Sequence, residues 1–111
     1  MDVSEILKAL ADTNRLRILN LLHDRTLCVC DLEAILELNQ SNLSRHLSRL
    51  KHAGLVTAQK KALFTYYARA EVAQPYGPVV DALCDAIHDD PTWATDRARL
   101  AKRLKTCEGC S

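Results

Sequence analysis

The stretch that most constrains the fold covers residues 31–53, where two segments with helical spacing are separated by a short polar break. Apolar residues recur every three or four positions in both segments, which is the pattern of one buried helix face. These residues are Leu32, Ile35 and Leu36, followed by Leu43, Leu47 and Leu50. Asn39 and Ser41 are typical of a turn and an N-cap, and Gly54 is typical of the residue that follows a C-cap. The stretch therefore predicts a helix-turn-helix pair.

The neighbouring segments extend this pair into a larger pattern. Helical spacing predicts two helices before it and two at the carboxyl end, and two β-rich runs behind the pair predict a hairpin. In chain order these are helices over 3–10 and 11–24, the hairpin over 55–61 and 63–69, and helices over 79–90 and 91–105. This order is that of a winged helix-turn-helix. We expect a mainly α fold with a small β-hairpin wing over residues 1–90, and a C-terminal helix with a cysteine-containing tail over 91–111.

The formal net charge of +1 conceals a segregation of charge along the chain. Residues 38–70 contain six Lys and Arg residues and no Asp or Glu, so this span carries +6. The remaining nine basic and fourteen acidic residues give the rest of the chain −5. A basic block of this kind is either a solvated face or the footprint of a nucleic acid. Here the block covers the second helix of the pair and the hairpin, which favours a nucleic acid.

The second helix of the pair carries polar and basic residues opposite its leucines. At about 100° per residue, Arg45 and Arg49 lie on the side away from the core. Such a helix fits the major groove of B-DNA, where Arg binds guanine and Asn or Gln binds adenine. The groove and phosphate candidates are Gln40, Ser41, Asn42, Ser44, Arg45, His46 and Arg49, with Lys60 and Lys61 on the wing against the DNA backbone. The alternative is an ordinary amphipathic helix with a solvated polar face.

Cys28 and Cys30 are separated by one residue at the start of the first helix of the pair. Residues i and i+2 of a regular helix point about 200° apart and cannot bind one ion. If Cys28 is the N-cap it escapes this limit, with Asp31 three residues on in an arrangement like a capping box. A helix N-terminus favours anions such as thiolates, and thiolates favour soft thiophilic ions. The alternative is that both cysteines are small buried hydrophobic residues.

Neither secretion nor a membrane span is indicated, because no apolar stretch approaches about 18 residues and no cleavable leader pattern is present. We expect a cytoplasmic protein with no membrane contact. Five cysteines in that compartment are expected to be metal-binding, redox-active or buried rather than disulfide-bonded. No nucleophile with a positioned base and no anion-binding loop is visible, so we do not expect an enzyme. A small thiol enzyme is the alternative from a different class.

Four stretches together resemble the ArsR/SmtB family of small dimeric repressors, namely "LADTNRLRILNLL", "LCVCDL", "NQSNLSRHLSRLKHAGLV" and "TYYAR". The resemblance covers roughly residues 5–70. It implies a homodimer, paired through its first and last helices (here 2–11 and about 72–89), that sits on double-stranded operator DNA and leaves it when a toxic metal or metalloid binds. "LCVCDL" resembles the arsenic-responsive branch, which implies Cys28 and Cys30 as ligands. The implied inducer is trivalent arsenic, as arsenite or methylarsenite, or antimonite, with no organic cofactor.

The chain departs from the arsenite pattern at Glu33, where a third cysteine is expected. A third thiolate can come from Cys84, Cys107 or Cys110, within the subunit or across the dimer. A ligand that needs only two thiols, such as methylarsenite, suits Cys28 with Cys30, or alternatively Cys84 with a cysteine of the tail. Cys84 is also a candidate core residue, because it lies in an apolar helical row.

Two further interpretations concern the same fold. A thiol redox repressor would oxidise the Cys28 and Cys30 pair to a disulfide without any metalloid. Asp85 and His88 suggest the zinc site that some relatives carry on their last helix, but their spacing does not match it. We therefore assign Asp85 and His88 to the solvated surface.

Overall fold

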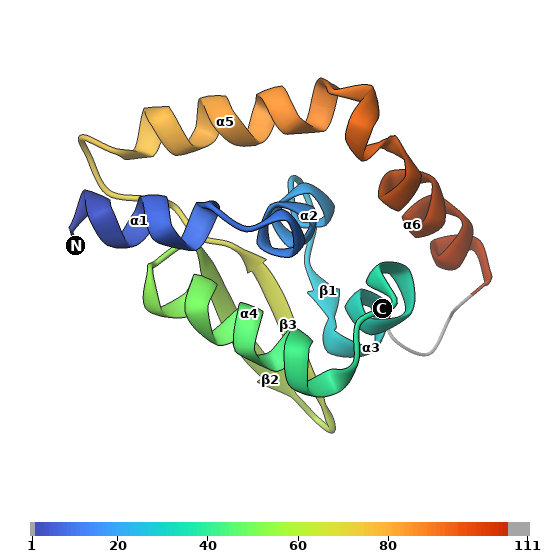
Figure 1. The fold of residues 1–111 in the computed structure, drawn as a ribbon. Helices are drawn as coiled ribbons and strands as arrows, with labels where there is room; N and C mark the ends of the chain where they lie inside the picture. Colours follow the sequence, from blue (N-terminus) through green and yellow to red (C-terminus); the bar gives the residue numbers. More distant parts are fainter. Residues whose placement is uncertain (1, 107–111) are drawn as a thin grey trace.

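The elements follow the predicted order with two additions, a short first strand and a short 3-10 helix before the last helix (Figure 1). The computed structural model describes residues 2–106. Its helices are α1 (Val3–Leu10), α2 (Thr13–Leu21), α3 (Val29–Leu36), α4 (Gln40–His52), α5 (Gly77–Asp89) and α6 (Ala94–Thr106), with the 3-10 helix η1 (Pro91–Trp93) before α6. Its strands are β1 (Leu27–Cys28), β2 (Val56–Lys61) and β3 (Phe64–Arg69). The predicted mainly helical winged helix-turn-helix is confirmed, with α3 and α4 as the helix-turn-helix pair.

Asn39 and Gly54 mark the two ends of α4, and the N-cap is Asn39 rather than the predicted Ser41, which lies in the first turn of the helix. The side chain of Asn39 accepts a hydrogen bond from the backbone N–H of Asn42 at 2.8 Å and so caps the first turn. Ala53 is the C-cap, and Gly54 after it adopts φ 77°. Only glycine enters this left-handed region without steric cost, so the predicted end of the helix is confirmed.

The wing belongs to a three-stranded antiparallel sheet in the order β1-β3-β2. β2 and β3 form the predicted hairpin, which turns between the paired residues Lys61 and Phe64. β1 lies on the other side of β3, where Cys28 is paired with Tyr66. The sequence does not reveal β1, because a strand of two residues has no periodicity to detect. Its pairing anchors Cys28 to the sheet directly before α3 begins.

The predicted apolar faces of the helix-turn-helix pair form the core. The six apolar residues predicted for α3 and α4 are at most 2% exposed. They lie in one cluster with Ile18, Leu19 and Leu55. Burial of one such side chain contributes about 1.5–3 kcal/mol to stability. Burial of the leucines of α4 therefore fixes the rotation of this helix about its own axis, with its polar face outward.

The helix α5 crosses the top of Figure 1, and α6 descends from its end toward α3. α6 packs against α3 and α2. The division of the chain at residue 90, between the winged helix-turn-helix and the C-terminal helix, stays a prediction. In the structure α6 packs directly against α3 of the helix-turn-helix pair. No helix within residues 2–106 is long and apolar enough to cross a membrane.

Apolar side chains remain exposed on the two helices that the resemblance assigns to dimer pairing. On α1 these are Val3 and Leu7, and on α5 they are Val79 and Leu83. Exposed apolar residues on two helices are typical of surfaces that pair with another protein. The homodimer stays a prediction.

We expect Leu47→Ala to lower the free energy of unfolding by about 2–5 kcal/mol, because the substitution leaves a cavity beneath α4. Leu63→Ala is the matched control, since Leu63 is 90% exposed, and it should change that free energy by less than about 0.5 kcal/mol. Urea unfolding followed by circular dichroism measures both. Equal losses for the two variants would contradict the assigned core.

Candidate nucleic-acid interface and thiol site

The exposed face of α4 carries most of the predicted DNA-contacting residues. Gln40, Ser41, Ser44, Arg45 and Arg49 are exposed. Asn42 is half-buried, and its side-chain oxygen accepts a hydrogen bond of 2.7 Å from Nη2 of Arg45. This bond holds the Arg45 guanidinium against the first turn of the helix. The predicted residues thus share one face, and their role in DNA contact stays a prediction.

His46 differs from the rest of the set because it points toward the body of the protein. Its side chain is 13% exposed, and its Nδ1 lies 3.2 Å from Nη1 of Arg15. Arg15 also donates to the carbonyl oxygens of Ala9 at 2.6 Å and Lys8 at 3.1 Å. Through Arg15, His46 therefore connects α4 to the end of α1. Nothing in the sequence distinguishes Arg15 from an ordinary surface arginine.

A groove of about 800 Å³ lies between the exposed face of α4 and the helices α1 and α2. Its walls are Glu5, Asp12, Arg15, Ser44, Arg45, His46, Ser48, Arg49 and His52. Burial by itself would raise the pKa of the Asp12 carboxyl. This effect is outweighed by backbone hydrogen bonds from Arg15 and Asn14 and by the charges of Arg15 and His46. The pKa of Asp12 therefore lies below its usual range. Asp12 therefore stays ionised opposite the basic residues of α4.

The wing presents Lys60 and Lys61 as exposed residues at the end of β2. The Nζ atom of Lys61 lies 6.0 Å from the centre of the Tyr66 ring. Arg69, the remaining cation of the hairpin, is instead bound to Asp81 of α5 through a 2.6 Å contact. The wing tip can thus present two lysines to a phosphate backbone, while Arg69 joins the wing to α5.

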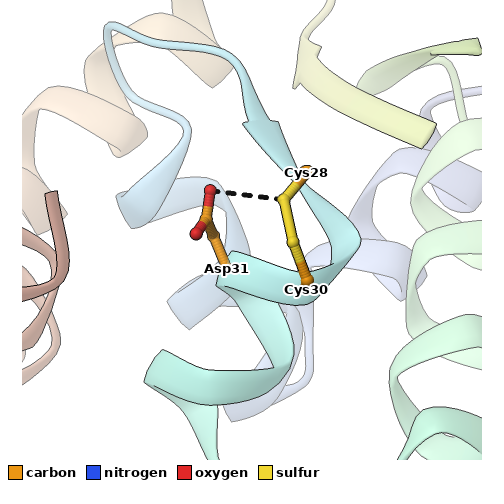
Figure 2. Close-up of side chains that lie close together, drawn as sticks. All are labelled: Cys28, Cys30 and Asp31. Atoms are coloured by element: carbon orange, nitrogen blue, oxygen red, sulfur yellow. Dashed lines mark hydrogen bonds between the residues drawn. A yellow bond between two sulfur atoms is a disulfide. The ribbon is translucent and has the colours of Figure 1, made fainter. Parts of the chain in front are cut away.

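The predicted role of Cys28 as N-cap of α3 is confirmed. Its backbone is extended, with φ −79° and ψ 160°, and its side chain makes no capping hydrogen bond. The capping-box analogy is therefore wrong in detail, because Sγ of Cys28 lies 3.4 Å from the Asp31 carboxylate instead (Figure 2). Released from helical geometry, the Cys28 side chain reaches Cys30. The two sulfurs therefore meet, which residues i and i+2 of a regular helix could not do.

In the structure the sulfurs of Cys28 and Cys30 are joined in a disulfide (Figure 2). The expectation that the cysteines are not disulfide-bonded is wrong for this pair, and the redox alternative predicts such a bond. The physical reason is the extended conformation of Cys28, which turns its side chain toward the first turn of α3. Binding of an ion or an arsenical requires the reduced pair, because the thiolate is the form of cysteine that acts as nucleophile and metal ligand.

The thiol pair lies beside a buried carboxylate. Cys28 and Asp31 are each 1% exposed and Cys30 is half-buried. Asp31 is bound by Arg103 of α6 at 2.7 Å between Oδ1 and Nε. Within residues 2–106, Cys28, Cys30 and Asp31 form the one group of three donors close enough to hold a common ion. The sequence predicts Asp31 as part of the capping pattern but does not indicate that Arg103 binds it.

The other predicted sulfur ligands do not join this group. Cys84 is 1% exposed and belongs to the hydrophobic core, which favours the core alternative. Burial raises the pKa of the Cys84 thiol, although the charge of Arg69 partly offsets the shift. Cys107 and Cys110 lie outside the described residues.

The assignment of Asp85 and His88 to the solvated surface holds for one of them. Asp85 has a side chain that is 68% exposed, and one oxygen lies 2.8 Å from Nε2 of His23. His88 is half-buried, and its ring stacks on the His23 ring with centroids 4.1 Å apart. The solvated assignment is therefore wrong for His88. His23 lies 62 residues before Asp85, too far for a spacing pattern to relate them.

Comparisons with known proteins agree with this fold. Residues 12–58 match the family described as "Bacterial regulatory protein, arsR family". Arsenic resistance transcriptional regulator ArsR1 of Pseudomonas putida is 36% identical over 100 residues, covering 87% of this chain and 76% of that protein. Cadmium resistance transcriptional regulatory protein CadC of Listeria innocua is 41% identical over 66 residues, covering 59% of this chain and 56% of CadC. Reduced HlyU from Vibrio cholerae superposes with a TM-score of 0.67 at 37% identity, covering 78% of this chain and 84% of that structure.

The fold and these matches define a transcriptional regulator of the helix-turn-helix class. The chain belongs to the arsR family of bacterial regulatory proteins. The resemblance found in the sequence and the expectation of a regulator rather than an enzyme are thereby confirmed.

We expect Cys84 in the reduced protein to react with iodoacetamide more slowly than free cysteine at pH 7.5, because burial raises the pKa of its thiol and shields the sulfur from the reagent. Timed alkylation followed by peptide mass spectrometry measures the rate. In 8 M urea the rate should rise to that of an unfolded cysteine. Rapid labelling of Cys84 in the folded protein would show that it is not shielded by the core.

Proposed function

We propose that this chain is a transcriptional repressor that leaves its operator DNA when trivalent arsenic binds Cys28 and Cys30. The single observation that carries the proposal is the position of the two sulfurs at the N-terminus of α3, the first helix of the helix-turn-helix pair. A ligand bound there acts on the helix that supports α4. The name of the arsenic regulator ArsR1 among the relatives supports the choice of inducer.

Methylarsenite suits a two-sulfur site because its arsenic carries two exchangeable hydroxyl groups. Each thiol forms one As–S bond, and each hydroxyl leaves as water with a thiol proton. Arsenite and antimonite can take a third thiolate, which Glu33 does not supply. Cys107 or Cys110 remains the proposed source of that third ligand, since Cys84 lies in the core. We place the protein in the cytoplasm, where small thiols keep the pair available.

The proposed partner is double-stranded operator DNA, contacted by a homodimer. The exposed face of α4 offers Arg45 and Arg49 to the major groove, and the wing offers Lys60 and Lys61 to the phosphates. One short helix makes few base contacts, so two half-sites about one helical turn apart are expected. The exposed apolar residues of α1 and α5 support pairing through those helices.

A thiol redox repressor is the second candidate, and the Cys28–Cys30 disulfide favours it. Reduction adds two electrons and two protons to the bond and restores two thiols. In this alternative peroxide alone, without an arsenical, would move the protein off or onto its operator. Operator binding measured in peroxide and in methylarsenite separates the two functions.

We expect a Cys28→Ser and Cys30→Ser double variant to bind operator DNA as the parent does, because serine retains N-cap ability and removes only the soft ligands. Methylarsenite should release the parent from the operator and leave the double variant bound. Fluorescence anisotropy of a labelled operator, with reductant present, measures both.

The matched control replaces Cys84, Cys107 and Cys110 by serine. This triple variant should still respond to methylarsenite, and its response to arsenite should be weaker than that of the parent. If the double variant responds normally while the triple variant does not, the inducer site lies at the carboxyl-terminal cysteines and the proposal fails.

We expect Arg45→Ala to weaken specific operator binding by about 1–3 kcal/mol, because Arg45 is exposed on the reading face. Lys60→Ala and Lys61→Ala should weaken all sequences alike and reduce the dependence of affinity on salt. Titrations of operator and scrambled DNA at several salt concentrations distinguish these effects. A change in base preference in the lysine variants would count against their phosphate role.

A further inference from the structure

A small cavity lies where α2, α5 and α6 meet, and the proposed function does not use it (Figure 1). Its volume is about 170 Å³. α6 lines it with Arg97, Leu100, Ala101 and Leu104, which recur every three or four residues and so share one face of that helix. No lining residue belongs to α3 or α4. A water molecule occupies about 30 Å³ of liquid, so the cavity has room for a small organic molecule.

Three residues that line the cavity carry a buried polar atom without a hydrogen-bond partner. These atoms are Oδ1 of Asn20, Nδ1 of His88 and Nη1 of Arg97. Within residues 2–106 one further atom of this kind exists, Nδ1 of His23, whose ring stacks on His88. Unpartnered buried polar atoms are rare in native proteins, because each costs free energy. Their concentration at one cavity indicates a ligand that supplies the missing partners.

The amide of Asn20 requires a hydrogen-bond donor from the ligand. Asn20 is 3% exposed, and its Nδ2 donates to the carbonyl oxygen of Trp93 at 3.3 Å. That carbonyl only accepts, so the amide nitrogen faces it and Oδ1 is the atom left without a partner. An amide oxygen is an acceptor alone. The ligand must therefore carry an O–H or N–H group on the side of α2.

The wall formed by α5 and α6 favours an anion. The guanidinium of Arg97 is always charged and only donates, and its Nη1 has no partner. Its charge acts on Asp90, but that carboxylate is exposed and accepts a hydrogen bond from a backbone N–H of its own turn. Arg25, an exposed residue of the wall, is paired with Asp24 through a 3.7 Å contact. Arg97 is therefore the cation that an anionic ligand would neutralise.

The geometry points to this cavity as a binding site for a small α-hydroxy acid. The carboxylate accepts hydrogen bonds from Nη1 of Arg97 and from Nδ1 of His88, in the tautomer that carries a hydrogen there. The hydroxyl group donates to Oδ1 of Asn20. The short alkyl group packs against the apolar part of the wall, which consists of Leu21, Leu100 and Leu104. Lactate is the smallest acid of this kind that carries an alkyl group.

The three polar atoms are buried within the wall, so binding requires small side-chain movements. Arg97 and His88 are half-buried, so they can change rotamer without opening the hydrophobic core. Asn20 lies on α2, His88 near the end of α5 and Arg97 on α6, so the acid bonds to all three helices. A ligand that binds the folded chain alone stabilises it by mass action. Lactate should therefore raise the melting temperature of the protein.

The test titrates the reduced full-length chain with each enantiomer of lactate in a calorimeter. We expect saturable binding of one enantiomer. Propionate lacks the hydroxyl and propylene glycol lacks the carboxylate, so each should bind at least about tenfold more weakly, because a buried polar group is left unpaired. Inorganic phosphate has no alkyl group for the leucines and should also bind more weakly. A cavity that holds only water predicts no saturable binding, and this result or equal affinities for lactate and propionate would overturn the inference.

Two variants and a matched control locate the site. Arg97→Met removes the charge that binds the carboxylate and should weaken lactate binding at least about tenfold. Ala101→Phe fills the cavity from an exposed position and should abolish binding while the charge of Arg97 remains. Lys105→Met removes an exposed cation of α6 outside the cavity and should bind lactate as the parent does.

Circular dichroism verifies the fold of each variant, and if one of the two cavity variants does not fold, the other decides. Parental affinity in a folded Arg97→Met or Ala101→Phe protein contradicts the inference. An equal loss in Lys105→Met does so too, because it would show attraction to the general charge of α6 rather than binding in the cavity.

This inference is independent of the proposed function, and one further variant separates the two. The Cys28→Ser and Cys30→Ser variant should bind lactate as the parent does. If it does so while methylarsenite fails to release the parent from its operator, the proposed function fails and the α-hydroxy acid site stands. If methylarsenite releases the parent and lactate does not bind, the reverse holds.

Discussion

The leucine face of α4 is the constraint on which the rest of the molecule depends. Leu43, Leu47 and Leu50 are at most 2% exposed, so any rotation of α4 about its axis would expose them and bury the charges of Arg45 and Arg49. Both changes cost free energy, because apolar surface would enter water and unpaired charge would leave it. The polar face is therefore directed outward by packing, before any DNA is bound.

The junction between β1 and α3 brings the sulfurs of Cys28 and Cys30 together. β1 pairs with β3 and holds Cys28 in an extended conformation, and the helix begins at the next residue. A change from extended to helical backbone at one peptide unit brings two cysteines of one segment together, which a continuous helix or strand would not do. A two-residue strand thus decides whether the sulfurs meet, and it joins the wing to the thiol pair through β3.

α6 adds a support that lies outside the part of the chain matching the family, residues 12–58. Arg99 and Arg103 reach from α6 to the two ends of α3, and Arg17 of α2 donates to the carbonyl of Leu36 and binds Asp96 of α6. These arginines satisfy carbonyl groups at the end of α3 and the buried charge of Asp31. The position of α3 therefore depends on α6, a helix far from it in the chain.

The sequence by itself determined the order of the six α-helices and of the hairpin strands, the core face of each helix of the pair and the end of α4 at Gly54, and it gave the hypothesis of Cys28 as N-cap. These features follow from periodicity and capping, which act over a few neighbouring residues. Only the tertiary structure decided the contacts of Arg103 with Asp31, His23 with Asp85 and Arg15 with His46, which join residues 72, 62 and 31 positions apart. No local pattern encodes such pairs, because they form when packing of the whole chain brings distant segments together.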